Sequence, residues 1–595
     1  MMAHHCDNPI PLVVAAIDFG TTYSGYAYSL RDDFNKDPLK ILINQKWGND
    51  KTTCAYKAPT SILFDRDRKF QSFGFSAESD YTDLIDNGEE EGWRFFRRFK
   101  MSLYREIKSE RGGRPVRRLG RDLNLEDEQG QRMPAMDIFS AAIRHLKDQL
   151  MNALMNAFMG LNPNDVRWVL TVPAIWSDAA KQFMREAAKQ AGIDGKQLTL
   201  ALEPEAAAIY CKENAVKAET EIGKSKDLSA FSPGEQFLLL DLGGGTVDIT
   251  CHSVNRDRTL KEIESSSGGP WGGTVVDDAF FSFLKELVGR DVWKDLKENN
   301  RTEILEVENS FDMKKRDVKK DKHYMIKVGS AFIESYNKLN ECDLAKQTLS
   351  ESKCSSLVEV KRDKLKINGT QMIEFFQGPM NNIVQHLERL FMKPSMRRVT
   401  TILMVGGFSE SDIMLKKIES SFPGKNVIRP IDASLAVLKG AVIFGHSPQA
   451  ISERTSPRTY GISVSVPYIA KVHPEKTFHI CDGNKMSTDV FHVMVKIGQQ
   501  VVMGKTKVEY VCRPARAYDK VSTVEVYEST EENPGYTFDP GCQKLGELRV
   551  SMPDISKGKE RRIRITMHFG FTELKVTARE EGTNNEAEVT FDCLR

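Results

Sequence analysis

The chain has 595 residues, of which 40% are hydrophobic and 28% are charged, and its 84 lysines and arginines nearly balance its 83 aspartates and glutamates. This length predicts three or four domains, and the composition is that of a globular protein and not of a disordered chain. A net charge of +1 gives no long-range attraction to nucleic acid or to an anionic membrane, so we expect neither as a partner.

The ten cysteines are widely spaced and contain no CxxC pair, which argues against a zinc module and against a disulfide framework. Reduced thiols of this kind are typical of the cytoplasm, and they also suit the nucleus. The N-terminal residues 1–11 are expected to be a disordered tail, and the stretch that follows has neither the basic start of a signal peptide nor the length of a membrane span.

The first patterned segment, LVVAAIDFGTTYSGYAYSL at residues 12–30, predicts an apolar strand, a glycine turn with small hydroxyl residues, and an alternating strand. Residues 237–254, FLLLDLGGGTVDITCHSV, repeat this plan with Asp241 in the place of Asp18. Two copies of one strand–turn–strand unit indicate a duplicated core.

Strands and helices alternate between the two copies. VRWVLTVPAIW at 166–176 predicts a buried strand, and Ser177 or Asp178 can cap the helix that follows, which Gly192 ends. LTLALEPEAAAIY at 198–210 predicts a second strand and another helix. This alternation is typical of an α/β architecture.

Two polar stretches interrupt the pattern, and residues 105–132 and 211–236 are both expected to be exposed insertions. TTILMVGGFSESDIMLKKIESSF at 400–422 then predicts a strand, a glycine turn and a helix. The apolar helix expected at 433–445 contains Gly440, which favours close contact with another backbone.

The C-terminal part consists of short alternating strands separated by Gly, Pro, Asn and Asp turns, which predicts an antiparallel β domain. The predicted units are a tail (1–11), lobe I (12–205), lobe II (206–446), a polar linker (447–459) and a β domain (460–595).

The two glycine turns point to a phosphate site. A strand that enters a glycine turn can direct several backbone N–H groups at one anion, because no Cβ blocks a close approach. Asp18 and Asp241 would repel phosphate directly, but each can hold a hydrated Mg²⁺ that bridges to it. The alternative for each aspartate is an ordinary hairpin cap.

Five stretches, IDFGTTYSG, TVPAIW, LEPEAAAIY, LDLGGGTVDIT and MVGGFSES, occur in the order found in the actin-like ATPase superfamily, and specifically in the heat shock 70 kDa chaperone family. Phrases such as KQFMREAAKQAG and LAVLKGAVIFG resemble its divergent branch, the heat shock 70 kDa proteins 12A and 12B. The resemblance spans residues 13–446 and extends loosely into the β region. It implies a duplicated actin-like, ribonuclease H-like ATPase domain of two lobes, followed by a small antiparallel β domain.

The resemblance also implies an ATP or ADP site with Mg²⁺. The residues implied to bind the nucleotide are Gly20, Thr21, Thr22, Tyr23, Gly243, Gly244, Gly245, Thr246, Asp312, Lys315, Arg316, Gly406 and Gly407. The residues implied in catalysis are Asp18, Lys100, Glu203, Asp241 and Thr246, with Asp248 behind them. Asp18 and Asp241 would face the metal through water.

Several of these assignments compete with structural alternatives. Lys100 could equally be a surface lysine, Glu203 a carboxylate favoured by a helix N-terminus, and residues 312–316 a charged helix face. Glu410 stands where the family usually has an arginine near the adenine, which argues against tight stacking on the base. Asp248 could be structural only.

Three functions remain open at this stage. The first is an atypical chaperone-like ATPase with slow hydrolysis in a cleft between lobes and a β domain that binds a protein client or partner. The second is a nucleotide-binding regulator or scaffold that has lost hydrolysis, and the third is a small-molecule kinase. The linker is polar, and the sequence ends with the strands of the β domain, whereas the family has a helical lid and a charged tail. Both features argue against tight clamping of a client.

Overall fold

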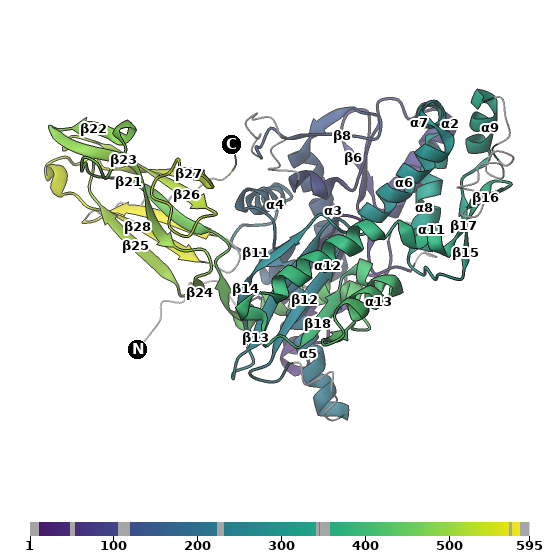
Figure 1. The fold of residues 1–595 in the computed structure, drawn as a ribbon, viewed down its shortest axis with the longest axis horizontal. Coiled ribbons are helices and arrows are strands. Elements are labelled where there is room, and N and C mark those ends of the chain that lie inside the picture. The colour runs from purple at the N-terminus through teal and green to yellow at the C-terminus, as the bar shows by residue number, and fades with distance from the viewer. Residues whose placement is uncertain are drawn as a thin grey trace.

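The computed structural model of the protein describes residues 11–47, 54–104, 119–222, 231–340, 344, 358–569, 574–582 and 594, with the backbone alone over 216–222. Figure 1 shows a large α/β part and, beside it, a smaller part built of strands. The expected tail at residues 1–11 and much of the insertion expected at 105–132 lie outside the described residues. None of the described helices is long and apolar enough to cross a membrane.

The first lobe is built on a mixed sheet. Its strands, in spatial order, are β11 (Leu198–Leu202), β10 (Val166–Val172), β1 (Val13–Phe19), β2 (Tyr23–Leu30) and β3 (Leu42–Ile43), with β4 (Ala58–Pro59) also paired to β2. Strands β1, β10 and β11 are parallel, whereas β1 and β2 form an antiparallel hairpin. The central strand VVAAIDF is buried on both faces, as is typical of a strand in a parallel sheet.

Helices cover one face of this sheet. Helices α3 (Ala135–Ala157) and α4 (Asp178–Gln190) pack there against alternate residues of β1. Ser177 caps α4, because its hydroxyl accepts a hydrogen bond of 3.2 Å from the Ala180 N–H, as the sequence predicts. A smaller unit beyond this face contains α2 (Phe75–Asn87), β5 (Ser61–Phe64), β6 (Phe70–Phe73), β7 (Arg94–Arg97), the 3₁₀ turn η1 (Phe99–Leu103), β8 (Asn124–Glu126) and β9 (Arg132–Pro134).

The second lobe repeats the plan on a second sheet. Its strands, in spatial order, are β19 (Asn426–Ile428), β18 (Thr401–Val405), β12 (Gln236–Leu242), β13 (Val247–Val254), β14 (Leu260–Gly269), β20 (Ile451–Thr455) and β24 (Gln500–Val502). As in the first lobe, the central hairpin, here β12–β13, has a parallel neighbour on one side. Helices α6 (Thr274–Val288), α12 (Gln377–Phe391) and α13 (Asp412–Ser421) cover its outer face.

Two helices lie between the sheets and join the lobes. Helix α5 (Glu203–Ile222) and helix α14 (Ala436–His446) share one core with residues from both sheets. A Cβ added at Gly440 would collide with the Ala206 carbonyl oxygen, so this glycine permits the close helix contact that the sequence predicts. The two-lobed α/β fold predicted from the duplicated hairpins is confirmed.

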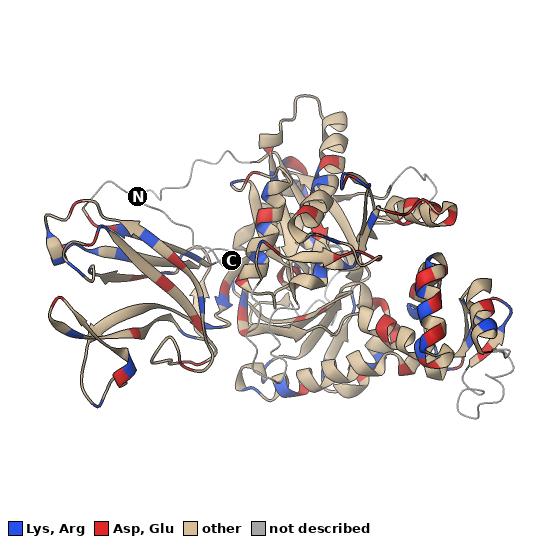
Figure 2. Ribbon diagram, turned by 90° about the horizontal axis from the view of Figure 1, so that it is seen from above, with Lys and Arg blue, Asp and Glu red and all other residues tan. Residues whose placement is uncertain are grey.

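A second small unit extends the second lobe, at the right of Figure 1. It comprises α7 (Arg290–Asn299), α8 (Arg301–Lys315), α9 (Ser330–Asn340), α11 (Gly369–Glu374) and the sheet of β15 (His323–Lys327), β17 (Lys364–Asn368) and β16 (Val358–Lys361). Figure 2 shows acidic and basic residues intermingled along these outer helices.

The C-terminal strands form a β sandwich. One sheet contains β22 (Phe478–Cys481), β23 (Asn484–Val495), β21 (Thr459–Pro467), β26 (Val521–Ser529) and β27 (Cys542–Ser551), and the other contains β25 (Lys507–Cys512), β28 (Ile563–Phe569) and β29 (Leu574–Glu580). Both sheets contribute to one apolar core. The predicted antiparallel β architecture is present at the left of Figure 1.

Two local predictions were wrong. The segment from Cys211 was expected to be an exposed insertion, but α5 continues to Ile222, and Cys211 is buried because it packs between the lobes. Within the polar linker, residues 451–455 form strand β20 of the second sheet. Arg454 on that strand forms an ion pair with the buried Glu205 of α5, with 2.6 Å from Nε to Oε1, which fixes the polar strand in place.

Candidate nucleotide site

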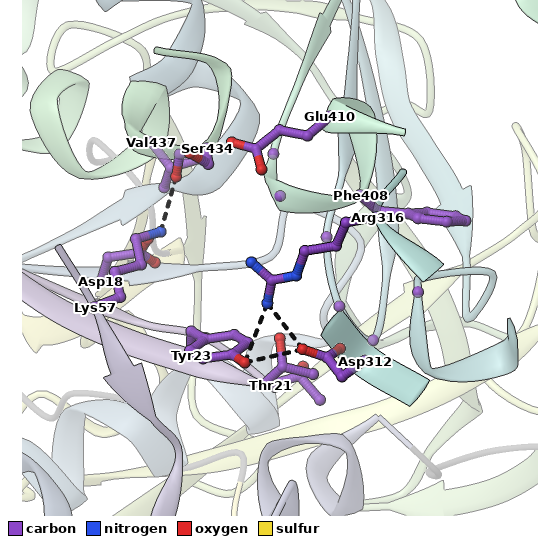
Figure 3. Close-up of a pocket in the computed structure, with 18 of the residues that line it drawn as sticks. Asp18, Thr21, Tyr23, Lys57, Asp312, Arg316, Phe408, Glu410, Ser434 and Val437 are labelled. Atoms are coloured by element: carbon purple, nitrogen blue, oxygen red, sulfur yellow. Dashed lines mark hydrogen bonds and ion pairs between the residues drawn. The ribbon is translucent and has the colours of Figure 1, made fainter. Parts of the chain in front are cut away.

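A cavity of about 590 Å³ lies between the two lobes (Figure 3). All of the residues assigned to nucleotide binding or catalysis from the sequence line it, although they come from segments spread between residues 18 and 407. They are Asp18, Gly20, Thr21, Thr22, Tyr23, Lys100, Glu203, Asp241, Gly243, Gly244, Gly245, Thr246, Asp312, Lys315, Arg316, Gly406 and Gly407. Asp248 lies behind this wall and is not part of the lining.

The two hairpin turns have the same backbone construction. Each turn begins with a glycine, and the carbonyl oxygen of the residue three positions later lies where a Cβ on that glycine would point. The pairs are Gly20 with Tyr23 in the first turn and Gly243 with Thr246 in the second. Only glycine accepts such an approach, which leaves the turn backbone open toward the cavity. The duplicated sequence therefore produces a duplicated turn.

The turns face each other across the cavity. A Cβ on Gly244 would collide with Thr22, and a Cβ on Gly245 would lie 2.6 Å from the hydroxyl oxygen of Thr21. The glycines of the second turn thus make room for the hydroxyl residues of the first. Backbone N–H groups and hydroxyls on two sides of one space are the donors that a phosphate chain requires.

The carboxylates at the two strand ends are in different electrostatic states. Asp18 is buried and accepts hydrogen bonds from Lys57 Nζ at 2.6 Å and from the Thr171 hydroxyl at 2.9 Å. Burial alone would raise the pKa of the Asp18 carboxyl, but the Lys57 ammonium and these hydrogen bonds hold it below its ordinary value. Asp18 is therefore an ionised, paired carboxylate.

No hydrogen bond from a lysine or a hydroxyl to Asp241 is found in the part of the chain that the structure describes, although the charge of Lys57 acts to lower the pKa of Asp241. Burial, followed by the nearby carboxylates of Glu203, Asp248 and Asp18, raises the pKa of Asp241 well above its ordinary value. Gly406, whose φ is +85°, brings its backbone beside this carboxylate, and a Cβ there would lie 2.5 Å from Asp241 Oδ1. The second turn therefore holds a carboxyl group whose ionised form the fold itself does not stabilise.

Glu203 begins helix α5 and faces Lys100. Lys100, which is 2% exposed, donates a hydrogen bond of 2.6 Å to Glu203 Oε1. Burial raises the pKa of Glu203 to about 7, even though Lys100 acts to lower it. Lys100 is therefore buried, and the surface-lysine alternative for it is wrong. Near neutral pH Glu203 can exist as a carboxylate or as the acid, and a group that orients water or moves a proton requires this property.

Asp248 is opposite Asp241 in the β12–β13 register. It accepts a hydrogen bond of 3.0 Å from the Ile175 N–H of the first lobe. Burial raises the pKa of Asp248, and this hydrogen bond partly lowers it. Its place behind the lining and its bond across the lobes agree with the structural alternative left open for it.

A group of polar side chains from β2 and the C-terminal end of α8 lines one part of the cavity. Figure 3 shows Tyr23, Asp312 and Arg316 pointing toward one another. The Tyr23 hydroxyl donates to Asp312 at 3.0 Å, and Arg316 donates to both, at 3.1 Å and 2.8 Å. Although burial opposes it, the charges of Lys315 and Arg316 hold the pKa of Asp312 well below its ordinary value. The first turn is thus tied to the second lobe.

Glu410 lies on another part of the cavity wall (Figure 3). It places a carboxylate, and not a cation, on the wall that faces Arg316. An acidic side chain cannot stack on a base as a guanidinium does. This wall offers hydrogen-bond acceptors to a nucleoside.

Several lining residues were not predicted from the sequence. Lys57 is the most consequential, because its ammonium contacts Asp18 and the Ser434 carbonyl oxygen of the other lobe. Apolar lining residues such as Phe408 and Met313 were also missed. No local motif marks Lys57, although the neighbouring AlaPro dipeptide of β4 is typical of an edge strand.

The two aspartates differ in their fit to a metal. At Asp241 the excess of carboxylates is the environment that a hydrated cation relieves, so the residues fit. At Asp18 they do not fit, because both carboxylate oxygens are already engaged by Lys57 and Thr171. Among the described residues no cluster of three or more potential ligands is arranged to hold a metal.

This architecture, two α/β lobes with facing glycine turns around one cavity, defines a protein of the actin-like ATPase fold class. A family model described as "Hsp70 protein" matches residues 116–576. The chain belongs to the Hsp70 family.

Individual relatives support this assignment. The chain is 33% identical to mouse "Heat shock 70 kDa protein 12A" over 639 residues, which cover 98% of this chain and 92% of that protein. It is 32% identical to human "Heat shock 70 kDa protein 12B" over 645 residues, or 98% and 91% of the two chains. "Chaperone protein DnaK" of Thermoplasma volcanium is 23% identical over 422 residues, covering 69% of this chain and 60% of the relative. These relationships place the chain in the 12 branch and suggest a nucleotide-binding, chaperone-like function.

Proposed function

We propose that the protein binds ATP and ADP in the cavity between the lobes and hydrolyses ATP slowly, with the β sandwich as its contact for a protein client or partner. The observation that carries this proposal is the pair of facing glycine turns, each following a strand that ends in an aspartate. Two such turns in one cavity suit a chain of phosphates better than any neutral ligand.

Each set of lining residues has a separate task in this proposal. The backbone of the turns at Gly20–Tyr23 and Gly243–Thr246 holds the phosphates, and Asp312, Lys315 and Arg316 contact the nucleoside. Glu203 orients the attacking water, and Lys100 holds Glu203 in place through their 2.6 Å contact. A Mg²⁺ ion, held through water by Asp241, would supply neutralisation of the phosphate charge.

The β sandwich offers an apolar surface at its far end for a protein partner. Exposed side chains there include Ile469, Val472, Phe478 and Ile480. Phe478 and Ile480 lie on β22, an edge strand of its sheet. Apolar side chains beside an unpaired strand edge are suited to an extended polypeptide.

A second candidate is a nucleotide-dependent regulator that does not hydrolyse ATP. Two observations favour it: Glu203 is already engaged by Lys100, and Glu410 faces Arg316 across the base end of the cavity. Both reduce the groups available for turnover without removing the phosphate cradle. The two candidates share the binding site and differ in activity.

The experiment compares Mg²⁺-dependent ATP hydrolysis and ATP binding in the wild type, Asp241→Asn and Glu203→Gln. We expect turnover to fall by about a hundredfold in both variants with binding retained, because neither residue holds the phosphates through its backbone. Asp321→Asn, on an exposed turn and not part of the lining, is the matched control. Binding without turnover in the wild type would favour the regulator, and absence of binding would contradict both candidates.

A further inference from the structure

Lys57 lies where the sequence places a hydrated metal ion, beside Asp18. Its Nζ is 2.6 Å from Asp18 Oδ2, and the other carboxylate oxygen accepts a hydrogen bond from Thr171. The two carboxylate oxygens therefore already have donors from the chain itself. A divalent ion that approached Asp18 would have to displace an ammonium ion.

The fold positions this lysine through a glycine. Asp18 of β1 is paired with Gly25 of β2, and a Cβ on Gly25 would lie 2.9 Å from Lys57 Cγ. Strand β4 holds the neighbouring backbone in place, because Ala58 is paired with Ser24. The aliphatic part of the Lys57 side chain thus crosses β2 at Gly25, the one position of that strand without a side chain. Its ammonium group reaches the carboxylate of Asp18, the residue paired with Gly25.

The same ammonium group also touches the second lobe. It donates a hydrogen bond of 3.0 Å to the Ser434 carbonyl oxygen on the 3₁₀ turn η6 (Ala433–Leu435). The Lys57 side chain is only 19% exposed, and it lines the cavity. Solvent screens a charge in this setting only weakly, so the ammonium attracts an anion bound in the cavity even while it is paired with Asp18.

The corresponding position of the second turn has no such cation. Asp241 lies beside the carboxylates of Glu203 and Asp248, and among the described residues no lysine donates a hydrogen bond to it, although the charge of Lys57 acts to lower the pKa of Asp241. A structural salt bridge alone would account for the contact of Lys57 with Asp18. It gives no reason for the ammonium to line the cavity, or for only one of the two equivalent aspartates to accept a hydrogen bond from it.

We propose that Lys57 is a built-in cation of the nucleotide site, which replaces a metal contact at Asp18, confines any Mg²⁺ to the Asp241 side, and makes nucleotide binding only weakly dependent on Mg²⁺. This inference rests on the proposed nucleotide-binding function. It adds a residue for which the family motifs found in the sequence provide no role.

The test measures the affinity for ADP by calorimetric titration of the full chain, with Mg²⁺ and with EDTA. We expect wild-type affinities in the two conditions to agree within about tenfold. In Lys57→Met the affinity in EDTA should fall by about tenfold to a hundredfold, because the phosphates then meet an unpaired Asp18. The fall with Mg²⁺ should be smaller, because the ion can then reach Asp18.

Three further variants make the outcome specific. Lys57→Arg should retain the wild-type ratio of affinities. Lys261→Met removes a lysine that pairs with Glu453 at 2.7 Å on the far side of the second sheet, and it should change neither affinity. Should Lys57→Met fail to fold, Lys57→Gln removes the charge but keeps a donor near Asp18 and the Ser434 carbonyl oxygen, and it should show the same increased dependence on Mg²⁺.

The ratio of the ADP affinities measured with Mg²⁺ and with EDTA separates the proposed role of Lys57 from a purely structural one. A loss that is equal with Mg²⁺ and with EDTA would overturn the inference, because a purely structural lysine weakens both conditions alike. Strict Mg²⁺ dependence of the wild type would also overturn it while leaving the proposed nucleotide binding intact. Absence of ADP binding in every condition would overturn both.

Discussion

The two hairpin turns of this protein share a backbone and differ in charge. Both bring an aspartate to the end of a buried strand and follow it with a glycine turn. In the first lobe the aspartate is paired with Lys57, and in the second lobe the aspartate is crowded by carboxylates. The duplicated motif keeps the same turn backbone, which is the proposed phosphate cradle, while the side chains around it diverge.

The strongest test of this contrast is to make the same substitution in both turns. Asp18→Asn should destabilise the fold by about 2 kcal/mol, because it leaves the ammonium of Lys57 largely buried without its counter-charge. Asp241→Asn should stabilise it by about 1 kcal/mol, because it removes a buried carboxylate that is held near others. Thermal unfolding in EDTA measures both, and shifts of the same sign would contradict the contrast.

The shared backbone can be tested at a glycine. Gly245→Ala should weaken ADP binding by about tenfold or more, because its Cβ would crowd both Met101 and Thr21 of the first lobe. Gly378→Ala in helix α12 is the matched control, since nothing lies within 4 Å of its added Cβ. Equal affinities for the two variants would show that the turns do not need to approach each other.

A third buried carboxylate sharpens the electrostatic side of the comparison. Glu262, 2% exposed, accepts hydrogen bonds from the Thr455 N–H and from Ser266, but burial and the carboxylate of Glu205 raise the pKa of Glu262 to about 7. A pKa raised on folding stabilises the fold fully below pH 4.5, the ordinary value, and this stabilisation is lost as the pH rises through 7.

The free energy of unfolding of the Glu262→Gln variant should therefore exceed that of the wild type by about 1 kcal/mol at pH 8 and should equal it at pH 4. Unfolding measured across this range gives the difference directly. A gain independent of pH would mean that Glu262 does not titrate in the folded protein.

The smallest effect is expected in the polar group that Tyr23 forms with Asp312 and Arg316. Tyr23→Phe removes the hydroxyl that links the first turn to Asp312 and Arg316. Because those two residues keep their own 2.8 Å ion pair, the loss should be about 0.5–1 kcal/mol of nucleotide affinity, with turnover unchanged. A large fall in turnover instead would place Tyr23 among the catalytic groups.

The sequence predicts the two turns and their aspartates well, because strand, glycine turn and strand are local signals. Lys100 lies on η1, which follows Arg98 with its left-handed φ of +52°, and reaches Glu203 from there. The role of Lys100 was predicted from the family resemblance and not from a local sequence pattern. Lys57 could not be found in this way. Its position depends on the pairing of β4 with β2 and on the space above Gly25, and both are non-local.

The polar linker shows the same limit. Its sequence lacks the apolar alternation of a buried strand, so pattern reasoning predicts a loop. In the structure its backbone pairs with β14 and β24, and Arg454 meets Glu205 from a position far away in the sequence. Backbone pairing and a long-range ion pair stabilise the strand, and neither leaves a local signal. The continuation of α5 beyond Tyr210 was missed for a related reason, because Cys211 and Ala215 pack into a core that contains residues of both sheets.

Hydrogen–deuterium exchange with and without ADP tests the central claim most directly, that two facing turns form one phosphate site. The account predicts that ADP slows exchange at the backbone amides of residues 20–23 and of residues 243–246 together. Exchange that is unchanged in both turns, or slowed in only one of them, would contradict it.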